Sequence, residues 1–184
     1  SAADDLILLD GRTSQTWMGD TPITVNCPAG KGRVIILSQD PDTGAFDKPV
    51  RWDGFGLSVS GSNQSAIYLA NFSIQGAVPS SLMMRAGGIY VMGAGELTGT
   101  CLSITGCGTS AAGAYCWGGA VLAMGATATF YNSTFANNLN IDNGMSGNYG
   151  AVSSLYGGNL SLTHCTIAGN RNSTTGVTTA KDST

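Results

Sequence analysis

Charged residues are scarce in this sequence. Lys and Arg number 8 and Asp and Glu number 11, so 10% of the chain is charged, against about 25% in typical soluble domains. The formal net charge is only −3, and no basic run is present that could neutralise a phosphate backbone. We therefore predict that nucleic acid is not a partner.

Long hydrophobic runs are missing as well. No stretch reaches the roughly 18–20 apolar residues of a membrane-spanning helix, and the first residues, SAADDLILLDG, lack the basic start of a signal peptide. We predict no membrane insertion by this segment, and we expect either a mature chain or a piece of a longer one.

The sequence also lacks the patterns of metal and cofactor sites. Its five cysteines fit neither a zinc site nor a redox Cys-x-x-Cys pair. Cys107 and Cys116 bracket a short segment and are candidates for a disulfide, with buried thiols as the alternative. Asp40 and Asp42 could offer oxygens to Ca²⁺, but they lack the spacing of an EF-hand, so a solvated loop is the better interpretation. We predict no cofactor and no metal.

Clustered carboxylates, which glycan-cleaving β-helix enzymes need, are absent too. Between residues 87 and 178 the acidic and basic side chains are few: Glu96, Asp142, His164 and Arg171. A catalytic pair must exist before its geometry can matter, so we predict that the chain is not an enzyme.

Against these absences stands a repeat of about 31 residues. Four segments align, starting at Ala66, Glu96, Thr127 and Asn159, with successive offsets of 30, 31 and 32 residues. Apolar and polar residues alternate within each segment, which indicates β-strands, and a fixed period indicates a solenoid. The period is too short for a propeller blade of about 40–45 residues. We predict an all-β fold, a right-handed parallel β-helix with about 30–32 residues per coil.

Stacked coils would bring equivalent residues into columns along the solenoid. Three apolar columns are predicted to point inward: Ile67, Leu97, Ala128 and Leu160; Leu69, Gly99, Phe130 and Leu162; Ile74, Ile104, Phe135 and Ile167. His164 falls in a column with Asn71, Cys101 and Asn132, which indicates a polar position near a corner and not a metal ligand.

Glycine and asparagine mark the corners between strands. We expect Gly118 and Gly119 to provide positive φ angles and close approach of neighbouring backbones. We expect Asn138 to take a left-handed turn conformation while its amide bonds to backbone, and Asn170, one coil later, to extend an Asn ladder.

Two short motifs resemble those of a known family. Gly118-Gly119-Ala120-Val121, together with Phe135-Ala136-Asn137-Asn138, resembles the GGA[ILV] and FxxN repeats of the chlamydial polymorphic outer membrane proteins and related β-helical surface proteins. Near matches extend the resemblance over roughly residues 56–172. The resemblance implies a right-handed parallel β-helix of the pectin lyase-like class at a cell surface, often with adhesive roles, and it indicates the fold better than the activity.

The chain is expected to form one domain, part of a longer protein. Residues 1–55 are predicted to be irregular N-terminal coils or a cap with a charged loop, residues 56–178 the β-helix coils, and residues 179–184 a polar tail. Five Asn-x-Ser/Thr sequons are candidates for N-glycosylation: Asn63, Asn71, Asn132, Asn159 and Asn172. They favour an extracellular or cell-surface location.

The leading functional hypothesis is a structural or adhesive β-helix of a surface or fibrous assembly. Its partners would be other copies or other domains of that assembly, with glycans as a further possibility. The alternative is a carbohydrate-binding or polysaccharide-cleaving β-helix that uses the acidic loop 39–54 and aromatic sugar platforms: Tyr68, Tyr90, Trp117 or Tyr156. The third hypothesis is ice binding through the column that holds Thr98 and Thr129, which has Tyr68 and Ser161 on either side.

Overall fold

The computed structural model describes residues 5–12, 16–19, 23–27, 33–61, 66–78, 86–93, 95–108, 118–140 and 151–172. All regular secondary structure in these ranges is β-strand, and all strand pairs are parallel. Within the same ranges, no helix has the length and apolar character needed to cross a membrane.

The strands form three large sheets and one small one. The first sheet consists of β1 (Asp5–Asp10), β4 (Val34–Gln39), β7 (Ala66–Ala70), β10 (Glu96–Thr100), β13 (Thr127–Tyr131) and β17 (Asn159–Thr163). The second consists of β2 (Thr16–Met18), β5 (Val50–Asp53), β8 (Phe72–Gln75), β11 (Ser103–Thr105), β14 (Thr134–Ala136) and β18 (Thr166–Ala168). The third consists of β3 (Ile23–Cys27), β6 (Leu57–Gly61), β9 (Ile89–Met92), β12 (Val121–Met124) and β16 (Val152–Leu155). The small sheet pairs β15 (Leu139–Asn140) with β19 (Arg171–Asn172).

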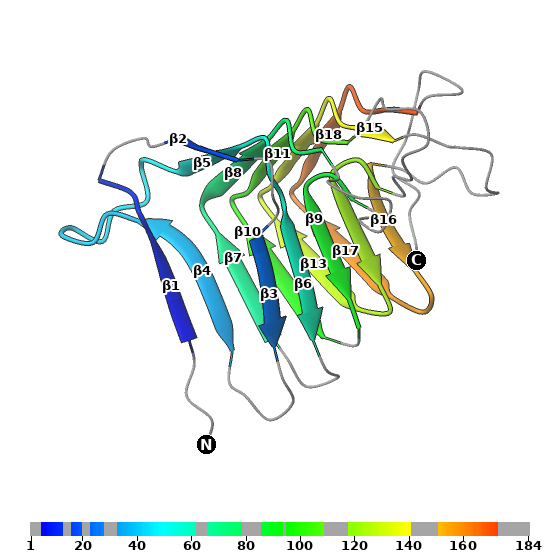
Figure 1. The fold of residues 1–184 in the computed structure, drawn as a ribbon, viewed down its shortest axis with the longest axis horizontal. Coiled ribbons are helices and arrows are strands. Elements are labelled where there is room, and N and C mark those ends of the chain that lie inside the picture. The colour runs from blue at the N-terminus through cyan, green and yellow to red at the C-terminus, as the bar shows by residue number, and fades with distance from the viewer. Residues whose placement is uncertain are drawn as a thin grey trace.

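Successive strands belong to successive sheets, so the chain winds through the first, second and third sheets before it returns to the first (Figure 1). A strand therefore pairs with its equivalent one coil away and not with its sequence neighbour. This topology is a β-solenoid, and the all-β parallel solenoid predicted from the repeat is confirmed.

The strand register matches the predicted columns. Leu97 pairs with Ile67 and with Ala128, and Ile104 pairs with Ile74 and with Phe135. These six side chains are at most 2% exposed and belong to one continuous core. The 31-residue period is thus the length of chain that brings one rung of the core directly over the previous one.

Gly99 is the apparent exception in an apolar column, and its neighbour explains it. A Cβ atom added to Gly99 would lie 2.5 Å from Cδ1 of Phe130, which is fully buried and packs edge-on against Phe135 with ring centroids 5.2 Å apart. The large ring one coil later fills the space that a side chain at residue 99 would occupy. The core therefore stays closely packed at this rung although residue 99 has no side chain.

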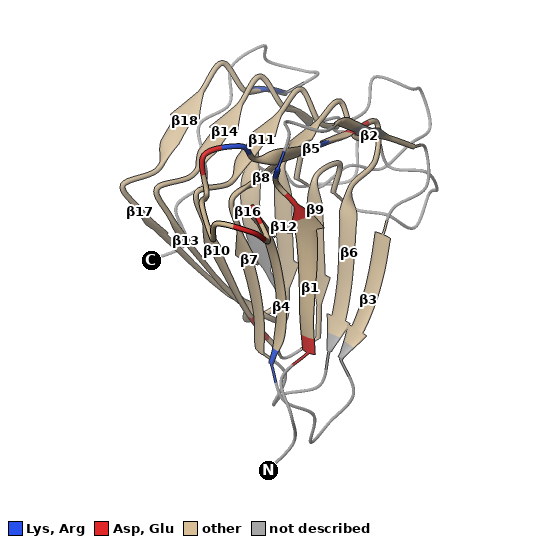
Figure 2. Cartoon of the chain, turned by 90° about the vertical axis from the view of Figure 1, so that its left-hand side faces the viewer, with Lys and Arg blue, Asp and Glu red and all other residues tan. Residues whose placement is uncertain are grey.

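The N-terminal residues form first coils of the same solenoid. Strands β1 to β6 join the three sheets of the later coils, and Trp52 on β5 stacks on Phe55 and Phe72 with ring centroids 5.5 and 4.6 Å apart. The segment that departs from the regular coil is residues 40–49, between β4 and β5, and it carries several charged residues. Figure 2 looks onto this end of the solenoid and shows that most strands carry no charged residue.

The corners contain columns of left-handed residues, and one prediction about them is wrong. Between the first and second sheets, Asn71, Cys101, Asn132 and His164 all have φ from 48° to 58°. After the second sheet the left-handed column is Gly76, Gly106, Asn137 and Gly169, with φ from 56° to 63°. Asn137, and not Asn138, therefore takes the turn conformation, because it occupies the place where the other coils have glycine.

The Gly-Gly pairs were predicted to supply both positive φ angles and close backbone approach, and only the second role is present. Neither Gly118 nor Gly119 is among the residues with positive φ. A Cβ atom at Gly118 would lie 2.4 Å from the carbonyl oxygen of Val121, and one at Gly119 would lie 3.0 Å from the backbone nitrogen of Leu139. Glycine is required at this corner because chain segments pack too closely for a side chain.

Part of the third sheet, on β9 and β12, is buried on both faces. Ile89 and Val91 on β9 point into the main core, whereas Tyr90 and Leu122 belong to a second buried cluster with Ala86. Tyr90 is only 7% exposed. Its ring is therefore a packing element and is not accessible as a sugar platform.

Candidate functional site

At one corner of the described structure, polar groups line a cavity. It lies at the ends of β14 and β18, where the chain turns through Asn137 and Gly169 into β15 and β19. Leu139 pairs with Arg171 in parallel register, so their side chains emerge on the same side of the small sheet. The amide N–H of Arg171 donates to the carbonyl oxygen of Asn138, which joins the two coils at this point.

A buried asparagine ladder holds this corner together. Asn138 Nδ2 donates to the carbonyl oxygen of Ile104 at 3.0 Å and to Oδ1 of Asn170 at 2.9 Å, and Asn138 Oδ1 accepts from the amide N–H of Cys107 at 2.9 Å. Asn170 Nδ2 donates in turn to the carbonyl oxygen of Phe135 at 2.8 Å. The two amides are 1% and 5% exposed and link successive coils. The corner is therefore rigid.

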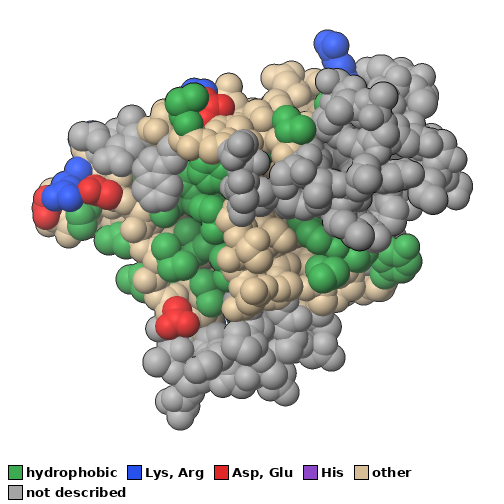
Figure 3. Space-filling model, viewed as in Figure 1, with side chains coloured by type: hydrophobic (Ala, Val, Ile, Leu, Met, Phe, Trp, Pro, Cys, Tyr) green, Lys and Arg blue, Asp and Glu red, His purple; other side chains and the backbone are tan. Residues whose placement is uncertain are grey.

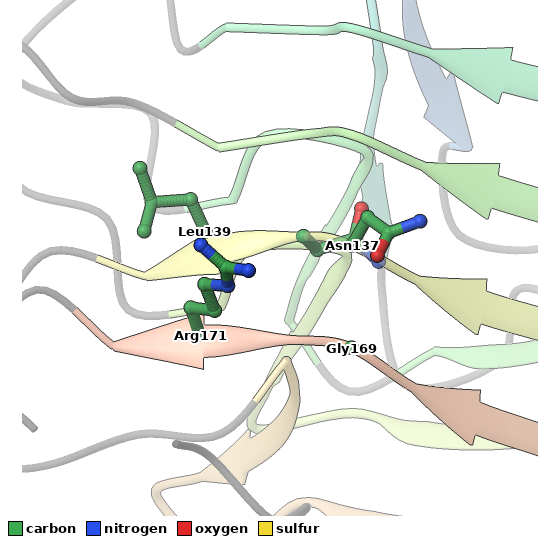
Figure 4. A pocket seen from close by; sticks show the side chains of 5 residues that line it. Asn137, Leu139, Gly169 and Arg171 are labelled. Atoms are coloured by element: carbon green, nitrogen blue, oxygen red, sulfur yellow. The ribbon is translucent and has the colours of Figure 1, made fainter. Parts of the chain in front are cut away.

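A pocket of about 350 Å³ lies on the outer side of the corner, lined by Asn137, Asn138, Leu139, Gly169 and Arg171 (Figure 4). A Cβ atom at Gly169 would lie 2.4 Å from Oδ1 of Asn137. The missing side chain at Gly169 thus leaves room for the Asn137 amide against the backbone. Figure 4 shows the Arg171 side chain extending from β19 toward β15, with Leu139 on the neighbouring strand.

The charge at this pocket is not balanced by the described protein. Arg171 is exposed, and no ion pair joins it to another residue in the described ranges. The described carboxylates that are nearest to Arg171 in the sequence are those of Glu96 and Asp53, and both lie on earlier coils. The corner can therefore offer a guanidinium fork, an amide and an apolar wall to a bound molecule.

The fold defines the class of this protein as a parallel β-solenoid. Comparison with protein-family models, with curated proteins and with solved structures found no match. Assignment beyond the solenoid class therefore rests on the residues of the chain itself.

The sequons lie in different surroundings. Asn132 and Asn159 are exposed, whereas Asn71 is half-buried, and its Nδ2 donates to the carbonyl oxygens of Ser38 at 2.9 Å and Phe46 at 3.0 Å. Asn63 lies outside the described residues, and for Asn172 only the backbone is described. Asn132 and Asn159 are thus the two sequons whose described side chains are open to modification.

The candidate calcium ligands make other contacts. Asp40 Oδ1 accepts the amide N–H groups of Asp42 at 2.8 Å and Thr43 at 3.1 Å, and these bonds lower the pKa of Asp40 below its ordinary value. The Asp42 carboxylate lies 3.6 Å from the guanidinium of Arg12. In the described ranges no three His, Cys, Asp or Glu residues are grouped to hold a metal ion. Asp40 thus makes its contacts within its own loop, whereas Asp42 lies beside Arg12 of the preceding coil.

The cysteine prediction falls partly outside the described residues. Cys116 is not described, so its pairing with Cys107 stays a prediction. Cys107 is buried, with its Sγ 3.5 Å from the carbonyl oxygen of Thr105 and 3.7 Å from that of Ile74. This side chain contributes to the core directly below the asparagine ladder.

The other candidates are dispersed over the solenoid. Tyr68 is 38% exposed with Arg33 stacked on its ring at 5.6 Å, Tyr156 is 74% exposed in a turn, and Trp117 is outside the described residues. Thr98 pairs with Thr129, between Tyr68 and Ser161, so the Thr column spans two rungs. His164 is exposed at a left-handed corner, as a polar corner residue should be.

Sequence reasoning missed the pocket. Asn137 and Arg171 were not proposed as binding residues, although both lie beside the predicted ladder. The sequence signal for the corner is the Asn137-Asn138 pair. Asn137 stands where the other coils have a corner glycine, and Asn138 then points into the interior.

Proposed function

We propose that this chain is a structural module of an extracellular or cell-surface assembly, in which solenoids join end to end. The proposal includes no catalytic step. One observation supports the end-to-end joining: at both ends of the described solenoid, side chains of the core columns become exposed to solvent.

The loss of burial occurs within single columns. Ile7 on β1 is 44% exposed, while its partner Ile36 on β4 is 2% exposed. At the other end, Ile167 on β18 is 36% exposed, while its partner Phe135 is fully buried. Figure 3 shows hydrophobic side chains gathered over β1 and β4 at the N-terminal end. Exposed apolar groups next to unpaired strand edges favour association.

The two ends are suited to each other. All strands of a sheet run in the same direction, so the β17 edge of one copy presents to β1 of another the same pattern that β13 presents to β17. The Ile7 column continues through Ile36, Leu69 and Phe130 to Leu162. A second copy would therefore place Ile7 over Leu162 and restore the core, in a head-to-tail contact.

This stacking can be tested with one substitution at each end. Ile7→Lys and Ile167→Lys should each leave the chain monomeric, because every junction needs both ends, whereas the parent should form elongated oligomers. Mixing the two variants should restore one junction and give dimers only. Light scattering after size exclusion would measure the masses, with Met92→Lys, 44% exposed on a middle coil, as the control.

Two outcomes would remove the stacking proposal. One is a parent that stays monomeric at every concentration tested. The other is an oligomer distribution that is unchanged by Ile7→Lys and Ile167→Lys, or that changes equally with Met92→Lys.

The extracellular part of the proposal is supported by the low charge, by the exposed sequons and by the resemblance of the GGA[ILV] and FxxN motifs to β-helical surface proteins. On secretion from a eukaryotic cell, we expect glycans on Asn132 and Asn159 and none on Asn71. A glycosylated amide keeps only one N–H, whereas Asn71 donates to two carbonyl oxygens. Peptide mapping by mass spectrometry before and after deglycosylation would measure the occupancy, and a fully occupied Asn71 would contradict the expectation.

A further inference from the structure

The corner pocket beside the asparagine ladder has a chemistry that stacking does not use. We propose that it binds an acidic sugar, with the sugar carboxylate on Arg171 and a ring hydroxyl on Asn137. This proposal does not rest on the end-to-end assembly, although Gly169 and Arg171 belong to the last described coil, which also carries the Ile167 edge.

The guanidinium selects the charged group of the ligand. Arg171 is exposed, lies beside the pocket and pairs with no described carboxylate, so an anion is the group that would complete its hydrogen bonding. A guanidinium presents parallel N–H donors that match the two oxygens of a carboxylate. Within residues 118–140 and 151–172, which form the described part of these coils, no carboxylate side chain is present.

The remaining lining favours a sugar over a simple acid. The Asn137 amide offers a donor and an acceptor, which is what a hydroxyl group needs, and Leu139 offers an apolar wall for the C–H face of a ring. A volume of about 350 Å³ is at the small end of ligand pockets and suits one monosaccharide unit. The left-handed backbone at Asn137 sets the direction of its Cα–Cβ bond.

The ladder beneath makes the pocket preformed. Asn138 lines the pocket and is bonded to Ile104, Cys107 and Asn170, so the backbone that carries Asn137 and Arg171 does not need to be ordered on binding. Preorganisation lowers the entropic cost of binding a small ligand.

The test is a titration of the full chain with glucuronate and galacturonate, followed by amide chemical shifts in two-dimensional NMR. Glucose and galactose serve as neutral counterparts, and acetate serves as a carboxylate without a ring. We expect uronates to shift the amides of Asn137, Leu139 and Arg171, with neutral sugars and acetate weaker by about tenfold or more.

Three variants assign the binding to the pocket. Arg171→Gln should weaken uronate binding by about tenfold or more, because it removes a charge-assisted hydrogen bond. Asn137→Gly should weaken it by a smaller factor while keeping the corner, since glycine occupies this position in the other coils. Asn132→Gly is the matched control, because it changes an exposed left-handed Asn at another corner and should leave affinity unchanged.

Several results would overturn the proposal. These are no shift with either uronate, equal binding of the neutral sugars, equal binding of acetate, or uronate affinity that survives Arg171→Gln. Thermal unfolding of each variant would show that a lost affinity does not come from a lost fold. None of these results bears on oligomerisation, so failure here leaves the stacking proposal to its own test.

Discussion

Gly87→Ala is expected to lower the free energy of unfolding by more than about 4 kcal/mol, or to prevent folding altogether. A Cβ atom at this position would lie 2.2 Å from the amide nitrogen of Gly108 and 2.8 Å from the carbonyl oxygen of Ala77. These two atoms are the donor and acceptor of a backbone hydrogen bond of 2.9 Å between coils. The methyl group would enter this bond and force whole coils apart, since no flexible side chain can yield.

The matched control for this substitution is Gly106→Asn. Gly106 has a left-handed φ of 62°, but a Cβ atom there would have its nearest neighbour at 3.8 Å. Asn already occupies the equivalent place at residue 137, and we expect a change within about 1 kcal/mol. Urea unfolding, followed by the fluorescence of the tryptophans and by circular dichroism, would compare the two variants. If Gly87→Ala unfolded at the same urea concentration as the parent, the predicted steric conflict at this corner would be contradicted.

The sequence predicts the solenoid because two independent periods agree. Alternation with a period of two residues indicates which side chains point inward, and the 31-residue period indicates which of them stack. The pairing of Leu97 with Ala128 and of Ile104 with Phe135 follows directly from both. No long-range contact has to be guessed, because each coil packs on the coil before it.

The corners are harder to predict because the same residue type serves two purposes. Asn favours left-handed backbone, and its amide also replaces backbone partners in a buried turn. Asn137 takes the left-handed backbone conformation, and the Asn138 amide bonds to backbone groups in the interior. The glycines at residues 106 and 169 carry the information that separates them, since they mark the left-handed column.

Burial on the outer faces could not be predicted from the repeat. Tyr90 alternates as an outward residue should, yet it is buried in a second cluster with Leu122 and Ala86. Arg171 was counted only as one of few bases, and its place beside Asn137 depends on the register of β15 with β19. Period and alternation determine which side chains enter the core, but they contain no information on what covers the outside.

Asn138→Ala is expected to have the second largest effect, a loss of about 3 kcal/mol in the free energy of unfolding. The substitution removes the acceptor of the Cys107 N–H and the donor to the Ile104 carbonyl oxygen. Both groups lie in the interior of the coil stack, where water cannot replace the missing partner without opening the corner. Asn137→Gly, one residue earlier and on the surface, should change stability by less than about 1 kcal/mol.

The ladder also predicts a coupling between coils. Asn170→Ala removes the acceptor of the Asn138 amide and leaves the Phe135 carbonyl oxygen without its donor. Because the two side chains share hydrogen bonds, the double variant should cost less than the sum of the single ones, by about 1 kcal/mol. Urea unfolding of the four proteins in this cycle gives the coupling directly. A coupling of zero would mean that each amide serves its own coil alone, and that the rigidity of the pocket corner does not come from the ladder.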